Sequence, residues 1–207
     1  DFKGRFLFPD GKECHPLTVL DDHSRFLVGL RACPNQKYTT VQEQLPLIFR
    51  QYGLPERMLM DNGSPWGDDS DTRHTILTAW LLRLGIAISH GRPFHPQTQG
   101  KDERLHRTLK EEVILQYSLQ DLFESQQVFD QWQHTYNCER PHEALQLDTP
   151  ASRYEKSPRS FPETLPPITY EPNDIARKVD KGGKVSIYNH TFRLGKPFRG
   201  QLVGFRP

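Results

Sequence analysis

The chain has 207 residues, of which 35% are hydrophobic and 26% are charged, with 17 prolines and 14 glycines. This length and apolar content suffice for a buried core and exclude a chain that is disordered throughout. No run of about 18 apolar residues occurs, and no apolar signal segment opens the chain, so we expect a cytoplasmic protein without a membrane partner.

The formal net charge of +1 hides an uneven distribution of charge. Residues 1–150 hold 16 Lys and Arg against 21 Asp and Glu, whereas residues 151–207 hold 11 against 5. The total charge by itself argues against a general polyanion binder, but an acidic body with a basic tail is more informative than that total. The three cysteines lie outside any CxxC pattern, which favours reduced thiols over a zinc framework.

The first part of the chain predicts three short strands joined by tight turns, over residues 1–8, 15–20 and 26–32. A helical apolar period follows from Val41 to Tyr52. Thr40 and Glu43 have the spacing of a capping box at its start.

The next elements predicted are a strand over 57–60, a helix over 76–84 and a strand over 86–89. Two further helices are expected over about 101–117 and 122–136, after a Pro- and Gly-rich loop.

The whole pattern indicates an α/β fold, with a mixed sheet flanked by helices, in residues 1–150. Residues 151–176 are rich in proline and predict a linker. Residues 177–207 predict a small basic β module that is incomplete at its C-terminal end.

Three carboxylates fall at the ends of predicted elements, namely Asp1, Asp61 and Glu103. Hard divalent cations such as Mg²⁺ take oxygen ligands, and a pair of such ions can activate water and stabilise the leaving oxygen of a phosphodiester. Each carboxylate also has an ordinary interpretation. Asp61 suits a turn in Asp-Asn-Gly, Glu103 complements a helix N-terminus, and Asp1 is simply the first residue.

Six motifs occur together in one order along residues 1–154. They are DFKG at 1–4, TVLDDHSR at 18–25, YGLPERM at 52–58, MDNGSPW at 60–66, HPQTQGKDERLHRTLKEE at 95–112 and YNCERPHEAL at 136–145. The set resembles the D-D-E transposases and retroviral-type integrases, and within them it is most similar to bacterial insertion-sequence transposases.

The resemblance implies a ribonuclease-H-like catalytic core followed by a β-barrel-like module. It implies that Asp1, Asp61 and Glu103 are catalytic and hold two Mg²⁺ or Mn²⁺ ions. The implied reaction nicks transposon ends and transfers the freed 3′-hydroxyl into target DNA. DNA is the implied partner, in a homo-oligomer associated with a bacterial nucleoid.

Several basic and polar residues are candidates for DNA contacts. Those around the Glu103 helix are Arg92, His95, Gln97, Lys101, Arg104, Arg107 and Lys110, and those in the basic module are Lys181, Lys184 and Arg199. A solvated charged surface is the alternative for each of them. Trp66 suits either base stacking or the core, and Asp21 and Asp22 suit a turn.

Two other functions remain open on the sequence. One is a non-catalytic DNA-binding or assembly fragment of a transposase. The other is a ribonuclease-H-type nuclease, which would share the fold and the metal ions.

Overall fold

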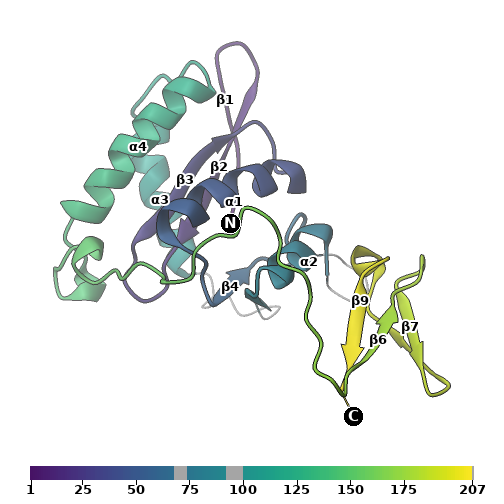
Figure 1. Ribbon diagram of the computed structural model, residues 1–207. Coiled ribbons are helices and arrows are strands. Elements are labelled where there is room, and N and C mark those ends of the chain that lie inside the picture. The colour runs from purple at the N-terminus through teal and green to yellow at the C-terminus, as the bar shows by residue number, and fades with distance from the viewer. Residues whose placement is uncertain (68–73, 92–99, 207) are drawn as a thin grey trace. The chain divides into compact units, whose positions relative to one another are not determined.

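The computed structural model describes residues 1–67, 74–91 and 100–206 (Figure 1). The chain divides into two compact units. The first unit comprises Asp1–Leu54 and Gly91–Phe161, and the second comprises Pro55–His90 and Pro162–Pro207. No helix among the described residues is long and apolar enough to cross a membrane.

An antiparallel sheet of three strands forms the centre of the first unit, in the order β1 (Phe6–Leu7), β2 (Glu13–Leu20) and β3 (Leu27–Cys33). The strand predicted over residues 1–8 is interrupted, because Gly4 has a φ of 96° that extended strands do not adopt. Only a bridge from Phe2 to Leu17 continues the pairing towards the start of the chain.

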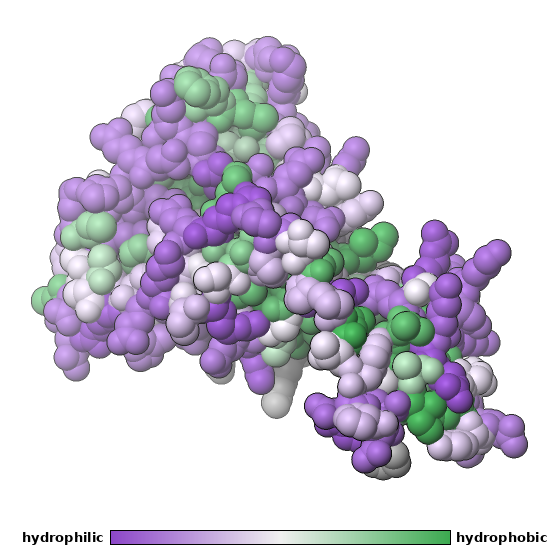
Figure 2. Space-filling view, viewed as in Figure 1, coloured by the Kyte–Doolittle hydropathy of each residue, from purple (hydrophilic) through white to green (hydrophobic). Residues whose placement is uncertain are grey.

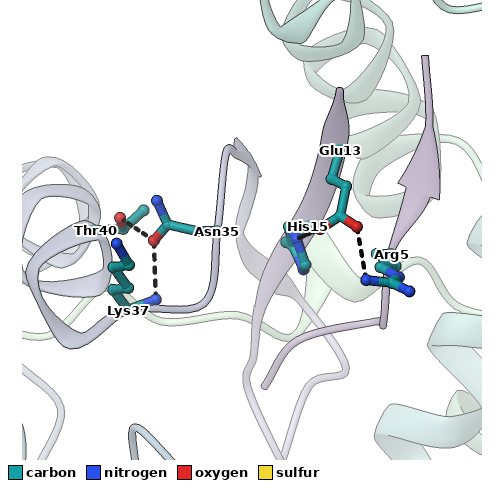
Figure 3. A network of polar contacts seen from close by, with 6 residues as sticks. All are labelled: Arg5, Glu13, His15, Asn35, Lys37 and Thr40. Carbon is teal, nitrogen blue, oxygen red and sulfur yellow. Dashed lines mark hydrogen bonds and ion pairs between the residues drawn. The ribbon is translucent and has the colours of Figure 1, made fainter. Parts of the chain in front are cut away.

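Helix α1 (Tyr38–Tyr52) packs on β3 through the predicted apolar face, and four of its residues are 0 to 4% exposed: Val41, Leu45, Ile48 and Phe49. The predicted capping box is wrong, because the helix starts before Thr40. Asn35 provides the acceptor instead: its Oδ1 takes hydrogen bonds from Lys37 N at 2.9 Å and Thr40 Oγ1 at 2.7 Å (Figure 3).

A polar network joins the residue just before β1 to β2 in the same unit. Arg5 Nη1 donates to Glu13 Oε1 at 2.6 Å, and the other Glu13 oxygen lies 2.9 Å from His15 Nε2 (Figure 3). The Arg5–Glu13 pair is exposed, so we expect it to contribute little to stability.

Helices α3 (Gly100–Leu109) and α4 (Leu122–Cys138) complete the first unit, with a π-helical turn at Lys110–Ile114 between them. Their apolar residues form one core with the sheet, which contains Phe8, Cys14, Leu27, Leu30, Leu105, Leu109, Val113, Leu119, Phe129 and Tyr136. Burial raises the pKa of the Cys14 thiol to about 12, so this cysteine stays protonated in the core.

The open edge of β3 is covered by amide side chains of α4. Gln126 accepts from Ala32 N at 2.9 Å and donates to Leu30 O at 3.0 Å, as a neighbouring strand would. Asn137 accepts from Leu27 N at 2.8 Å and donates to Leu27 O at 3.0 Å. An uncovered strand edge promotes association with other chains, and these amides close it.

The segment that follows the short 3₁₀ turns Glu143–Leu145 and Pro150–Ser152 packs against the first unit. The ring of Tyr154 stacks on Phe26 with centroids 4.1 Å apart. Leu54 N donates to Arg159 O at 2.7 Å, which pairs this segment with the chain just after α1. The first part of the predicted linker is thus ordered and packed on the first unit.

The second unit contains the parallel pair β4 (Arg57–Met60) and β5 (Ala87–His90), with α2 (Ile76–Arg83) in the connection between them. Thr75 caps α2: its Oγ1 accepts from Thr78 N at 3.2 Å. Parallel neighbours require such a crossover.

The rest of the second unit holds four short strands, β6 (Ile175–Lys178), β7 (Lys184–Ile187), β8 (His190–Arg193) and β9 (Leu202–Phe205). They pair as β6 with β9 and β7 with β8, and no closed barrel is found among the described residues. Figure 2 shows that this region exposes apolar side chains among hydrophilic ones, and the exposed apolar residues there include Phe192 and Leu202.

We predict that Asn137→Ala lowers the free energy of unfolding by about 1–3 kcal/mol, because it leaves the buried N–H of Leu27 without its side-chain acceptor, whereas Gln133 Nε2 still donates to Leu27 O at 2.7 Å. Urea denaturation measures this loss. Gln127→Ala on the exposed face of the same helix is the matched control and should change stability by less than about 0.5 kcal/mol. Equal effects of the two substitutions would contradict the role of Asn137.

Candidate active site

Asp1 is fixed by main-chain pairing with β2. Its N-terminal nitrogen donates to Thr18 O, and Thr18 N donates to Asp1 O, both at 2.8 Å. The carboxylate accepts from Phe2 N through Oδ1 at 2.7 Å. Asp1 is half-buried, so its side chain lies at the surface of the unit on a backbone that the sheet determines.

Glu103 lies in the first turn of α3, where a negative charge complements the helix dipole. Leu105 and Leu109 anchor the helix in the core at 2% and 0% exposure. Glu103, Arg107 and Lys110 are exposed, so the predicted separation of an apolar face from a charged face is confirmed.

The hydroxyl of Thr18 links the strand of Asp1 to the helix of Glu103. Thr18 Oγ1 lies 3.1 Å from Asp1 O and 2.8 Å from His106 Nε2. A hydroxyl has one proton to donate, so donation to Asp1 O makes His106 Nε2–H the donor to Thr18. Thr18 is 1% exposed, and its two partners in this bridge are partly buried.

Asp102 is a carboxylate of α3 that the sequence analysis did not single out. Burial raises its pKa, while the ammonium group of Asp1 lowers it. The residue is partly buried, in contrast to its exposed neighbour Glu103. Both acids belong to the Lys-Asp-Glu-Arg stretch at 101–104, and the family motif selects only Glu103 as catalytic.

Asp61 belongs to the second unit and follows β4 directly. Its Oδ1 accepts from Asn62 N at 2.7 Å, and its carbonyl oxygen lies 3.0 Å from His90 Nδ1. Its approach to Asp1 and Glu103, which belong to the first unit, remains a prediction.

The loop after Asp61 is tightly wound. Trp66 N and Gly67 N both donate to Gly63 O at 2.9 Å. A Cβ on Gly67 would lie 2.2 Å from Asn62 O, so only glycine fits there. Trp66 is 4% exposed, and its side chain belongs to the core rather than to a base-stacking surface.

Within the described residues, no three His, Cys, Asp or Glu side chains are close enough together to hold a metal ion. The donor chemistry of Asp1, Asp61 and Glu103 nevertheless fits Mg²⁺ or Mn²⁺, because all three supply hard carboxylate oxygens. All three side chains are at least partly accessible.

The candidate DNA-binding residues divide into three groups. Arg104, Arg107, Lys110, Lys181, Lys184 and Arg199 are exposed. Lys101 donates to the Asp22 carboxylate and is partly buried. Arg92, His95 and Gln97 lie outside the described residues. Asp21 has its predicted turn role, because its Oδ2 accepts from Ser24 N at 2.8 Å.

Thr18 and His106 are the residues of this site that sequence reasoning missed. His106 follows Glu103 by three positions and therefore lies on a neighbouring side of the helix. Thr18 stands between the apolar residues Leu17 and Val19 in β2. Neither pattern indicates that the two side chains meet.

Two family models described as "Integrase core domain" match this chain, one over residues 1–96 and the other over residues 84–150. A chain in the simian T-cell lymphotropic virus intasome, in complex with PP2A regulatory subunit B56 gamma, is similar with a TM-score of 0.61 and 15% identity. That similarity covers 86% of this chain and 60% of the intasome chain, so the present chain spans less than two thirds of it.

The catalytic core domain of BIV integrase is similar with a TM-score of 0.53 and 20% identity, over 73% of this chain and 90% of that domain. At such identities the likeness shows the fold alone, which is a ribonuclease-H-like α/β fold with a mixed sheet and helices. The expectation of this fold is confirmed. The link to bacterial insertion sequences stays a prediction.

We predict that His106 makes stability fall in mild acid. Burial lowers its pKa from 6.5 to about 3, and the N-terminal ammonium and Lys3 act in the same direction. Between these two pH values the unfolded chain binds a proton that the folded chain does not. The free energy of unfolding should therefore fall by about 2 kcal/mol between pH 7.5 and pH 5 through this group.

Urea denaturation at both pH values tests this. His106→Gln should lose that part of the pH dependence, whereas His134→Gln, whose ring is largely exposed, should keep it. An unchanged pH dependence in His106→Gln would show that the ring is charged in the folded protein.

Proposed function

Because the chain belongs to the integrase core domain family, whose members are polynucleotidyl transferases, we propose that it is the catalytic core of a DNA transposase or integrase. The observation that carries this proposal is the Thr18–His106 bridge, which fixes the strand of Asp1 to the helix of Glu103. Two carboxylates that are distant in the sequence thereby belong to segments joined within one unit.

Asp1, Asp61 and Glu103 would hold two Mg²⁺ or Mn²⁺ ions. Bound there, such ions activate a nucleophile and stabilise the leaving oxygen of a phosphodiester. In the first reaction water attacks phosphorus at a transposon end and the 3′-hydroxyl leaves. In the second reaction that 3′-hydroxyl attacks a phosphodiester of target DNA, and the target strand's 3′-oxygen leaves.

The exposed cations of α3 would bind the DNA backbone beside the carboxylates. Arg107 and Lys110 lie one and two turns after Glu103, on the exposed face of the helix segment. Their charges offset the repulsion between the acidic site and a phosphate. Arg104 extends this surface, and Arg92, His95 and Gln97 remain candidates in the preceding loop.

Lys101 has a different environment from the other cations of this helix. Its ammonium group donates to both the side chain and the main chain of Asp22. We therefore propose that DNA binding by Lys101 requires release of this ion pair, which is exposed and weak.

The basic β region supplies a second DNA-binding surface in this proposal. Lys181, Lys184 and Arg199 are all exposed there, and phosphate contacts of this kind are tolerant of sequence. One of the similar structures is an intasome chain, which supports the further proposal that this protein acts on DNA as a homo-oligomer.

Carboxylate substitution tests the proposed chemistry. Asp61→Asn and Glu103→Gln should each reduce Mn²⁺-dependent nicking of a DNA end by at least about 100-fold, since loss of a ligand should exceed the effect typical for a ligand's partner. Single-turnover cleavage of a labelled end substrate measures this. Glu111→Gln, an exposed acid on the segment after α3, is the matched control and should retain activity.

Full activity of Asp61→Asn or Glu103→Gln would exclude that residue as a catalytic carboxylate. Cleavage of only RNA–DNA hybrids by the wild-type chain would favour a ribonuclease instead.

Salt dependence tests the basic surface. The triple variant Lys181→Ala, Lys184→Ala, Arg199→Ala should lower the slope of log Kobs against log salt by up to about 2.7, at about 0.9 per phosphate contact. Fluorescence anisotropy with a duplex at several salt concentrations gives the slope. Lys12→Ala, which removes an exposed cation paired with Asp10, should leave it unchanged, and an unchanged slope in the triple variant would overturn the assignment.

A further inference from the structure

In the parallel pair of the second unit, β4 ends at the residue just before Asp61. The register pairs Met60 with His90, which are the last residues of β4 and β5. Asp61 therefore follows the final rung of the ladder. Its carbonyl group continues the row of β4 acceptors at a position where β5 has already ended.

The imidazole of His90 takes the place of the missing rung. His90 Nδ1 lies 3.0 Å from Asp61 O, and a carbonyl oxygen only accepts, so Nδ1 carries the hydrogen. His90 Nε2 is buried and has no hydrogen-bond partner among the described residues. The ring is therefore assigned as the neutral Nδ1–H tautomer, because an Nε2–H there would be a buried donor without an acceptor.

Hydrogen bonds on both sides of the Asp61 Cα atom restrict its orientation. The carbonyl is held by His90, and Oδ1 accepts from Asn62 N at 2.7 Å. The carboxylate is thus aimed by two local contacts, while Oδ2 makes no hydrogen bond among the described residues. Oxygen ligands need such fixed partners, because a metal site loses affinity when its ligands are free to turn.

A second histidine, His74, belongs to the same unit as His90. His74 lies just before α2, and burial lowers the pKa of its ring. The His74 ring packs edge-on against Phe198, with centroids 5.3 Å apart. His74 Nδ1 is also buried without a hydrogen-bond partner in the described part of the chain.

We propose that His90 is a positioning residue, whose Nδ1–H group fixes the main chain of Asp61 and so aims the Asp61 carboxylate at the metal site. The inference rests on the proposed function for its consequence in catalysis, but the hydrogen bond itself is a property of the protein without metal or DNA.

The first test is spectroscopic and needs neither ion nor substrate. Long-range ¹H–¹⁵N spectra of the 207-residue chain with ¹⁵N-labelled histidine report which ring nitrogen bears hydrogen. We expect His90 to be the Nδ1–H tautomer. An Nε2–H tautomer would overturn the proposal, since Nδ1 then has no hydrogen to donate.

The second test compares two substitutions with different donors. His90→Asn places an amide nitrogen where Nδ1 lies, whereas His90→Phe keeps the ring volume and removes the donor. His90→Phe should weaken Mn²⁺ binding, followed by electron paramagnetic resonance, by about 10–100-fold and reduce nicking in parallel. His90→Asn should restore most of both.

The controls separate the possible failures. Ser89→Ala removes a neighbouring hydroxyl, which Arg57 contacts at 3.5 Å, and should behave as wild type. Asp61→Asn measures the full loss. If Asp61→Asn leaves nicking intact, the proposed function fails; if it abolishes nicking while His90→Phe binds Mn²⁺ as wild type does, only the role of His90 is excluded. Equal loss in His90→Phe and His90→Asn would likewise overturn the positioning role, because it would reflect packing alone.

Discussion

The first unit depends on one buried hydroxyl. Thr18 pairs with Asp1 through both main-chain groups, and its side chain reaches His106 across the sheet-to-helix boundary. Because Thr18 is 1% exposed, water does not compete with these contacts. Any rotation of α3 that separated His106 from Thr18 would leave a buried hydroxyl group short of a partner, which is costly. The segment of Asp1 and the helix of Glu103 are therefore joined through the interior of the first unit.

Side chains also complete the hydrogen bonding at one strand edge in each unit. Amide side chains of α4 complete the ladder of β3, and the imidazole of His90 completes the ladder of β4 at Asp61. In each case a side chain takes over where a neighbouring strand is missing. The first substitution closes an edge that would otherwise invite association, and the second fixes a residue of the candidate site. The side chains of Gln126, Asn137 and His90 thus make the hydrogen bonds that the main chain of a neighbouring strand would otherwise make.

Periodicity predicted most elements of the fold, because apolar alternation and helical spacing are local. It placed α1, α2, α4 and the strands near Met60 and His90 close to their observed bounds. It missed the interruption at Gly4, the π-helical turn after α3 and the start of α1 at Tyr38 after the uncapped Lys37. These depend on backbone dihedral angles and on which of several nearby acceptors a donor selects, and spacing does not encode that choice.

The candidate site was less accessible to sequence reasoning than the fold. Motif order selected three carboxylates, but the groups that orient them are ordinary residues in ordinary positions. A threonine in a strand and two histidines have no spacing signature, since their partners lie far away in the chain. Asp102 shows the same difficulty: two adjacent acids on a helix differ in burial, and only packing decides which is enclosed.

Catalysis as proposed requires that Asp1, Asp61 and Glu103 converge on divalent cations. A crystal structure of the chain grown with Mn²⁺, with the ions located by their anomalous scattering, tests this most directly. We expect Mn²⁺ bound by carboxylate oxygens of all three residues. Mn²⁺ held by Asp102 in place of Glu103, or an ion site that excludes Asp61, would contradict it.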